Sequence, residues 1–404
     1  MKNNGEPASS RVGPVHGKPD ARSCIDPGAR DAEAPISPGL YVHVPFCKTK
    51  CPYCDFYSIV DGAGVARWLD ALSREAAHHR GSFGPFDTLY IGGGTPSVLG
   101  EAEICALFDG LRAAFDFAPD FEVTIEANPD DVTAAIAGSW REAGVNRVSL
   151  GVQSFDDAEL KYLRRRHDAA QAGEAVRLLE RAGFSNVGID LMYGFAGQSL
   201  EGWESSMRRA LEISPAHLSC YQMTIEGATE FGRMLETGAI KRLDEETERA
   251  FFMKTAEFLT AHGYIHHEIS NFARDEALVS RHNHKYWRHA PYLGLGPSAH
   301  SFRNGKRWWN ARSVDAYCTA LEGGGSPVDG METLGEDELA FEEVFLGFRT
   351  RDGVPLELLG RFPGWRHTLE NLVAESLVIV ARGRAVPTVK GFCVADRLAV
   401  AFAD

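Results

Sequence analysis

Short apolar runs alternate with amphipathic stretches over the first two thirds of the chain. Six runs have the length of buried strands: 40–45, 87–91, 121–126, 146–152, 186–191 and 217–222. Six stretches carry apolar residues at helical spacing: 65–80, 101–115, 131–143, 169–183, 199–213 and 244–263. Repeated β-then-α units predict parallel strands joined by right-handed crossovers. The unit count predicts an α/β fold with a partial TIM-type (β/α)6 barrel, and a doubly wound sheet is the alternative.

The two ends of the chain have a different character. Residues 1–38 are rich in Gly, Pro, Ala, Ser and mixed charge, which predicts a disordered extension. We expect the barrel to span 39–265 and a His- and aromatic-rich segment, 266–330, to complete it. Residues 331–404 combine short helical patterns with an apolar segment and a Gly-containing turn, which predicts a small helical or winged-helix-like domain.

Composition narrows the function classes. The chain has 404 residues, of which 44% are hydrophobic and 24% charged, so it can bury a large core and is expected to form more than one domain. A net charge of -14 argues against nucleic-acid binding by general basic attraction. No run approaches the ~18 apolar residues of a membrane span, and the first forty residues lack the apolar core of a signal peptide. These features predict a soluble, cytoplasmic protein.

Polar or glycine-rich clusters directly follow the predicted strands. They are the segment after 40–45, Gly92–Pro96, Glu126–Pro129, Gln153–Phe155, Asp190 and Tyr221–Met223. In a parallel β/α barrel the carboxyl ends of all strands open onto the one face that carries chemistry. The topology therefore predicts that these clusters converge there.

Three cysteines, Cys47, Cys51 and Cys54, fall within eight residues at CxxxCxxC spacing. Three- and four-residue spans reach at most ~10–14 Å, so the thiols can converge on one centre. A closed zinc site needs four ligands, and a disulfide would leave one cysteine over. A [4Fe-4S] cluster held by three thiolates would instead keep one iron open for another ligand. Cys24 is expected to be a free thiol; the remaining cysteines lack ligand spacing and are predicted to be buried: Cys105, Cys220, Cys318 and Cys393.

The stretch Tyr41–Phe56 resembles the cluster loop of radical SAM enzymes, in particular the HemN/HemW branch. The resemblance implies a [4Fe-4S] cluster on Cys47, Cys51 and Cys54, with S-adenosylmethionine (SAM) at the open iron. The matching segments after the strands then imply these SAM contacts: Tyr41, Gly93, Gly94, Thr95, Glu126, Gln153, Arg165 and Asp190. Without the resemblance, each of these residues has an ordinary explanation. The glycines could form a tight turn and Glu126 an ion pair at the mouth of the barrel. Arg165 could be a surface charge, and Asp190 could cap the turn that follows it.

The sequence departs from the family pattern at two places. Residues 193–198 read Tyr-Gly-Phe-Ala-Gly-Gln, where relatives generally have Leu-Pro-Gly-Gln, so the proline that stiffens this turn is missing. In the basic run at 164–166, the arginine that contacts SAM is uncertain by one position.

A second motif lies beyond the barrel units. The segment from Tyr264 to Trp287 is the densest cluster of His and aromatic residues in the chain. On its own such a segment is more often an aromatic-rich loop packed under a barrel. It matches the HNxxYW signature of HemW-type heme chaperones, which implies that heme contacts His282, Tyr286 and Trp287, with His282 the first choice. Imidazole is a common ligand of heme iron.

One position separates the branches of the family. In coproporphyrinogen III dehydrogenases the cluster loop continues as CxxxCxxCxC, whereas this chain has Phe56 at the last position. The resemblance therefore implies a heme chaperone that delivers heme to acceptor proteins. A dehydrogenase that decarboxylates porphyrinogen propionates and a radical SAM methyltransferase are the alternatives. Dimerisation and transient membrane association through a partner are further expectations from the family.

Overall fold

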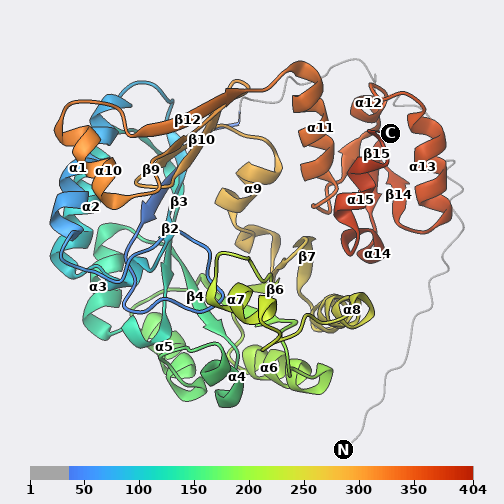
Figure 1. Ribbon diagram of the computed structural model, residues 1–404, viewed down its shortest axis with the longest axis horizontal. Helices are drawn as coiled ribbons and strands as arrows, with labels where there is room; N and C mark the ends of the chain where they lie inside the picture. The colour runs from blue at the N-terminus through green and yellow to red at the C-terminus, as the bar shows by residue number, and fades with distance from the viewer. Residues whose placement is uncertain (1–35, 404) are drawn as a thin grey trace, which may run out of the picture. The chain divides into compact units, whose positions relative to one another are not determined.

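The computed structural model describes residues 36–403, so the extension expected at 1–38 lies almost wholly outside the described residues. Residues from Ser37 onward form one compact unit, drawn in Figure 1. It begins with six strands and the helices that follow them: β1 (Gly39–Val44), α1 (Val65–His78), β2 (Phe86–Gly93), α2 (Glu101–Ala114), β3 (Phe117–Ala127), α3 (Ala134–Ala143), β4 (Arg147–Gln153), α4 (Asp157–Tyr162), α5 (Ala169–Arg181), β5 (Val187–Tyr193), α6 (Leu200–Glu212), β6 (His217–Gln222), α7 (Glu230–Glu236) and α8 (Glu245–Ala261). Every predicted strand and helix is present, within a few residues of its predicted ends.

Further elements extend this barrel at both edges. They are β7 (Ile265–Glu268), β8 (Asn271–Ala273), α9 (Arg281–Trp287), β9 (Tyr292–Leu295), β10 (His300–Arg303), β11 (Lys306–Asn310), α10 (Val314–Glu322) and β12 (Val328–Thr333). The twelve strands run in the order β12-β11-β10-β9-β1-β2-β3-β4-β5-β6-β8-β7. β1 to β6 are parallel, β9 joins β1 in parallel, and β8 joins β6 antiparallel. The result is a curved, open sheet, as a partial barrel requires.

The C-terminal segment has its own small sheet and core. Its elements are α11 (Glu336–Gly347), β13 (Val354–Pro355), α12 (Leu356–Leu359), α13 (Trp365–Ala374), β14 (Val378–Ala381), β15 (Arg384–Pro387), α14 (Val389–Phe392) and α15 (Ala395–Val400). The three strands are antiparallel in the order β13-β15-β14. An apolar cluster that includes Val344, Phe348 and Leu398 holds these elements together. The sequence predicts a small helical or winged-helix-like domain here, and the structure has helices beside a three-stranded sheet.

Local sequence explains where several helices begin. The Thr133 hydroxyl accepts a hydrogen bond from the amide of Ile136 at the start of α3, and Asp168 with Gln171 forms a capping box at the start of α5.

The helices of the barrel pack their apolar faces on the outer side of the sheet, whereas α9 lies on the inner side (Figure 1). In the part of the chain that the structure describes, no helix is long and apolar enough to cross a membrane.

Candidate functional site

Residues on the parallel strands alternate between two environments. On β3, Val123 and Ile125 are buried in the apolar core that the outer helices cover. Between them, Thr124 and Glu126 point to the inner side of the sheet, because neighbouring residues of a strand face opposite ways. The same alternation occurs on the other parallel strands. The inner side of the barrel is therefore polar, and the predicted site residues on the strands belong to it.

The three cysteines lie on a loop whose ends are tied together. Phe46 pairs with Ile59 in an isolated bridge, and the Cys47 amide donates to the Ile59 carbonyl at 2.9 Å. The Cys54 amide donates to the Cys51 carbonyl at 3.2 Å, which makes a tight turn. All three thiols are free and half-buried, and burial raises the pKa of the Cys54 thiol.

Thiolates in this number are suitable ligands for an iron–sulfur cluster. Within residues 36–403, no three Cys, His, Asp or Glu side chains are arranged as a metal site. The fit of a cluster at this loop therefore stands on the donor chemistry of Cys47, Cys51 and Cys54 and on the groups around them.

Backbone hydrogen bonds join the glycine turn, Gly92–Pro96, to the start of the cysteine loop that carries Cys47, Cys51 and Cys54. The Gly94 amide donates to the Val44 carbonyl and the Thr95 amide to the Phe46 carbonyl, both at 2.8 Å. A Cβ atom at Gly94 would lie 2.7 Å from the Phe46 oxygen, so no larger residue fits without moving the loop. The Thr95 hydroxyl lies 3.2 Å from the Cys47 sulfur. Gly94 and Thr95 thus lie next to the first cysteine of the loop.

Tyr41 and His43 connect strand β1 to the end of the same loop. The Tyr41 hydroxyl donates to His43 Nδ1 at 3.1 Å, and His43 Nε2 donates to the Tyr57 carbonyl at 2.8 Å. Gly93 has φ of +109°, and a Cβ there would lie 2.7 Å from the His43 ring. The Tyr41 ring stacks on Tyr90 with centroids 6.2 Å apart.

Two half-buried carboxylates, Glu126 and Asp190, face the barrel interior. Glu126 accepts hydrogen bonds from the Tyr90 hydroxyl at 2.8 Å and the Gly93 amide at 3.2 Å. Asp190 accepts the Ser149 hydroxyl at 3.0 Å. Burial raises the pKa of both carboxyls, that of Glu126 to about 7, and the neighbouring Asp190 adds to the shift. Glu126 can therefore change its charge near neutral pH or gain a cationic partner from a ligand.

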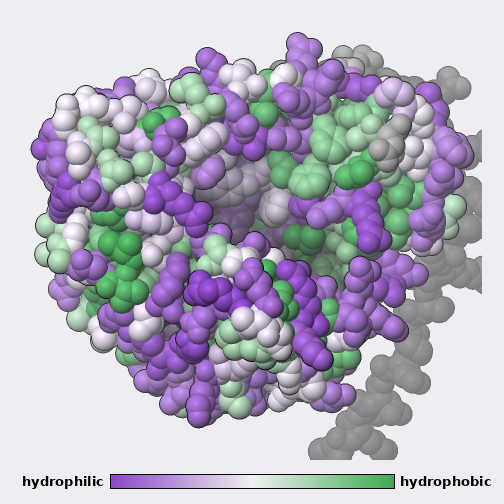
Figure 2. All heavy atoms as spheres, viewed as in Figure 1, coloured by the Kyte–Doolittle hydropathy of each residue, from purple (hydrophilic) through white to green (hydrophobic). Residues whose placement is uncertain are grey.

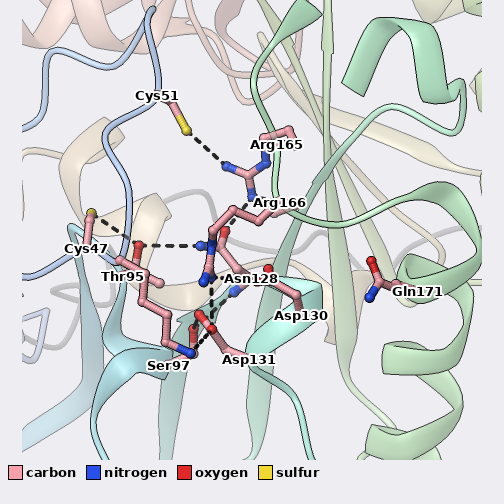
Figure 3. A network of polar contacts seen from close by, with 12 residues as sticks. Cys47, Cys51, Thr95, Ser97, Asn128, Asp130, Asp131, Arg165, Arg166 and Gln171 are labelled. Atoms are coloured by element: carbon pink, nitrogen blue, oxygen red, sulfur yellow. Dashed lines mark hydrogen bonds and ion pairs between the residues drawn. The ribbon is translucent and has the colours of Figure 1, made fainter. Parts of the chain in front are cut away.

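Arg165 connects the second cysteine to the strand ends. Its Nη1 donates to the Cys51 sulfur at 3.4 Å, and its Nη2 donates to the Gly151 carbonyl at 2.8 Å and to the Asn128 side chain. The buried Nε has no hydrogen-bond partner among the described residues. Figure 3 shows the guanidinium between the cysteine loop and Asn128. This cation is placed to offset negative charge on the thiolates.

The neighbouring arginines have other partners. Arg164 has φ of +50° and pairs with Glu230 at 2.6 Å, whereas Arg166 pairs with Asp130 at 2.7 Å and Asp131 at 2.9 Å. Of the run 164–166, only the middle side chain contacts a cysteine of the loop. The geometry thus favours the arginine that the sequence singled out.

Gln153 lies at the end of β4 in an unusual backbone conformation. Its φ is +68°, in the left-handed region, which costs a non-glycine residue roughly 1–2 kcal/mol. The side-chain nitrogen lies close to Gly151, where a Cβ would approach it to 2.9 Å. The half-buried amide therefore stays on the inner side of the sheet, near Arg165.

Helix α9 places its signature residues away from the cysteines, toward the amino ends of the strands. His282 is buried, with Nδ1 2.9 Å from the Thr88 hydroxyl and Nε2 2.9 Å from the Tyr286 hydroxyl. Its ring stacks on Tyr90 with centroids 5.1 Å apart. Burial lowers the pKa of His282 to about 3. Trp287 is half-buried at the end of the helix. Both ring nitrogens of the predicted heme contact are thus already engaged.

Sequence reasoning missed one buried acid of the site. Asp131 accepts from Lys48 at 2.6 Å and from the Ser97 hydroxyl at 2.9 Å, and it also pairs with Arg166 (Figure 3). It therefore ties the cysteine loop to the glycine turn. Its place just after the cluster at 126–129 was the only signal in the sequence.

The prediction for the other cysteines was partly wrong. Cys220 and Cys318 are buried as expected, but Cys105 is exposed on α2 and Cys393 is half-buried. Cys105 lies on the solvent side of an amphipathic helix whose buried positions are taken by Ile104, Leu107 and Phe108.

Comparisons with known proteins agree with this geometry. The family model of the radical SAM superfamily matches residues 41–210. The heme chaperone HemW of Mycobacterium tuberculosis is 36% identical over 364 residues, which is 89% of this chain and 93% of that protein. The chain belongs to the HemW family of the radical SAM superfamily. The heme chaperone HemW of Bacillus subtilis is 35% identical over 318 residues, covering 78% of this chain and 84% of that protein.

A solved structure gives the same fold. Coproporphyrinogen III oxidase (HemN) of Escherichia coli, described as a radical SAM enzyme, superimposes with a TM-score of 0.79 at 25% identity. The match covers 92% of this chain and 91% of that one. For this HemW family member, the partial barrel with a C-terminal domain is thereby confirmed.

Proposed function

We propose that this protein is a heme chaperone, which binds heme and delivers it to acceptor proteins. The observation that carries the proposal is its identity of 36% over 89% of the chain to a protein named as a heme chaperone. A match of this length includes the barrel and helix α9. Heme is the cargo in this proposal, and the cluster and SAM are resident cofactors.

The cofactors fit the end of the barrel at which the parallel strands have their carboxyl ends. Cys47, Cys51 and Cys54 would hold the [4Fe-4S] cluster. When bound, the cluster supplies a redox centre with one iron that SAM can chelate. Arg165, 3.4 Å from the Cys51 sulfur, offsets thiolate charge. The exposed backbone of the glycine turn can receive the amino-acid end of SAM.

The two interior carboxylates complete the SAM site in this proposal. Glu126 and Asp190 lack a salt-bridge partner within the described chain, so a cationic ligand would stabilise their charged forms. Tyr41 and Gln153 lie on the same inner side and would supply the remaining polar contacts.

Phe56 favours the chaperone over the dehydrogenase. Its side chain is 70% exposed, so the loop does not need this residue for packing. By resemblance, a coproporphyrinogen III dehydrogenase carries a further cysteine at this position. The second candidate function keeps one argument in its favour, because the fold matches that of coproporphyrinogen III oxidase over almost the entire chain.

Two assays on one anaerobic preparation separate the candidates. The reconstituted protein is given SAM, a reductant and coproporphyrinogen III, and in parallel hemin-loaded protein is mixed with an apo-hemoprotein. The chaperone proposal predicts transfer of heme to the apo-hemoprotein and no protoporphyrinogen IX. Formation of protoporphyrinogen IX without heme transfer would favour the dehydrogenase and overturn the proposal.

We further infer that the protein works in the cytoplasm with heme-accepting partners, as a homodimer that contacts the membrane only through a partner. The described cysteines form no disulfide, which supports a cytoplasmic location. The net charge of -14 disfavours direct adsorption to an anionic bilayer. Light scattering of the protein with and without heme measures its oligomeric state.

A further inference from the structure

A heme chaperone needs a ligand for the heme iron, and the inference below rests on that proposed function. Most described histidines already use ring nitrogens in hydrogen bonds or ion pairs: His43, His167, His217, His262, His266, His267, His282, His284, His289 and His367. Among residues 36–403, the histidines with neither kind of partner are His78, His79 and His300. Heme iron requires one unshared nitrogen of a neutral imidazole, and in these three histidines both nitrogens are unshared within the described chain.

The first two lie on the outer side of the molecule. His78 is exposed in the last turn of α1. His79 lines a shallow outer pocket with Phe83, Arg303 and Trp308. Neither approaches the barrel interior.

His300 lies on the inner side, and the strand register shows it. Phe302 is paired with Tyr292 of β9, and Tyr292 is paired with Gly39 of β1. Paired residues point to the same side of a sheet, and so do residues two apart on one strand. His300 therefore faces the same side as Tyr41, which lies two residues beyond Gly39.

His300 also lies close to the predicted SAM site. Gly294 of β9 is paired with Tyr41, and a Cβ at Gly294 would collide with the His300 carbonyl oxygen. His300 and Tyr41 are thus two strand spacings apart, about 10 Å. The residue between them has no side chain, so nothing from β9 separates the imidazole from the interior.

The surroundings of His300 suit a planar ligand. Trp309 is directly opposite on β11, with ring centroids 5.9 Å apart and planes inclined by 29°. A Cβ at Gly330 would collide with the indole, so this glycine lets the ring lie flat across β12. His300 is exposed, so its ring is open to a ligand, and desolvation by its neighbours and secondarily Arg307 lower its pKa.

We propose that His300 ligates the heme iron, with the porphyrin lying along the inner side of β9 to β11 beside Trp309. Figure 2 shows this side of the molecule hollowed near its centre, between the strands of the barrel and the C-terminal helices. His282 then has a different task, which is to hold α9 in the barrel through Thr88 and Tyr286.

The experiment is a hemin titration of the full-length protein, followed by visible absorption and by electron paramagnetic resonance of the ferric heme. The parent is compared with His300→Ala, His300→Met and the exposed control His78→Ala. We expect His300→Ala to weaken hemin binding by on the order of tenfold or more, since removing a residue that merely orients a metal ligand costs 10–100-fold. Added imidazole restores the parent spectrum. His300→Met changes the spectrum to that of a thioether ligand, and His78→Ala behaves as the parent.

Other outcomes distinguish the two proposals. If His300→Ala binds hemin with the affinity and spectrum of the parent, His300 is not the ligand, and the chaperone function stands. If the parent itself binds no hemin, both proposals fail. Circular dichroism and reconstitution of the iron–sulfur absorbance confirm that each variant is folded. If His300→Ala does not fold, the spectrum of hemin bound to His300→Met tests the ligand instead.

Discussion

The two ends of the barrel interior are both polar, yet their charges are arranged differently. At the amino ends of the strands, Lys285 of α9 pairs with Asp87 at 2.6 Å, and Arg147 lies 4.0 Å from Glu122. At the carboxyl ends, Glu126, Asp190 and Arg165 form no salt bridge within the described residues. A buried charge without a partner is costly, so the second end is the place where a ligand can supply the missing charge.

The contrast teaches how to recognise the site. Burial and polarity alone would select both ends, and the HNxxYW residues lie at the paired end. Their contacts hold a helix inside the barrel. Only the end near the cysteines combines unpaired charges with free thiols and exposed backbone.

Loss of the cluster is the largest effect that we expect. Replacing Cys47, Cys51 or Cys54 with serine should abolish the iron–sulfur absorbance after anaerobic reconstitution, because each supplies one of three thiolates. Cys105→Ser, at an exposed cysteine of α2, is the control and should leave the absorbance intact. Equal loss in the control, or retention of the absorbance in the three loop variants, would contradict the ligand set.

Breaking an ion pair at the amino ends of the strands should lower the free energy of unfolding without changing the affinity for SAM. Lys285→Met leaves the Ser37 carbonyl without its partner and leaves Asp87 with only the longer contact to Arg281. Removing one member of a fully buried pair costs about 3–5 kcal/mol, which is the upper bound here because Asp87 is partly exposed. We expect a lower free energy of unfolding in urea and unchanged SAM affinity. The control is Arg281→Met on the same helix, whose exposed side chain is 3.6 Å from Asp87; such a pair contributes about 1 kcal/mol or less. A large fall in SAM affinity for Lys285→Met would remove the distinction between the two ends.

The arginines test the cofactor end with matched substitutions. Arg165→Lys keeps the charge but loses the fork that reaches Cys51 and Gly151. Losing a hydrogen bond to a charged group costs about 1.5–3 kcal/mol, so calorimetry should show SAM binding about 10–100-fold weaker. Arg164→Lys, in an exposed ion pair, should bind SAM as the parent does. The opposite result would move the SAM contact to Arg164.

The smallest effect is a pH dependence. Burial raises the pKa of Glu126 to about 7, above its ordinary value of 4.5, so the folded protein binds the proton more tightly than the unfolded chain. Stability is therefore present below the unfolded pKa and falls as pH rises through about 7. Without SAM, Glu126→Gln should reduce this fall by on the order of 1–2 kcal/mol.

Urea unfolding between acid and neutral pH measures that slope. Glu75→Gln is the comparison, because burial also raises the pKa of Glu75 to about 7, but its carboxylate is bonded to Gly296, Asn310 and Tyr317 and to none of the predicted SAM contacts. We expect both variants to flatten the slope but only Glu126→Gln to weaken SAM binding. An unchanged slope in Glu126→Gln would show that this carboxyl is ionised in the folded protein at all these pH values.

Local patterns were sufficient to predict the barrel units and the cofactor end. The apolar run at 40–45 became β1, Gly39–Val44, because its alternation and the polar loop after it are local properties. The convergence of the cysteines, glycines and Glu126 followed from the parallel topology. The choice among the arginines at 164–166 depended on the turn at Arg164, which no local pattern reveals.

Long-range register explains what the sequence did not predict. The motif at His282 identified the family but not its partner Thr88, which is 194 residues away and occupies one ring nitrogen. The inner-facing position of His300 depends on the pairing of β10, β9 and β1, which are remote in sequence. Propensity and spacing carry no information on such contacts.

The most direct test of the chaperone account is a hemin titration of the purified protein with the cluster intact and of the cluster-free Cys51→Ser variant, each followed by gel filtration. The account predicts saturable binding to the parent, with heme that remains bound through the column and is released to an apo-hemoprotein. It also predicts binding to the variant, because the proposed iron ligand is His300 and not one of the three cysteines. Absence of saturable binding to the parent, together with conversion of coproporphyrinogen III, would contradict it.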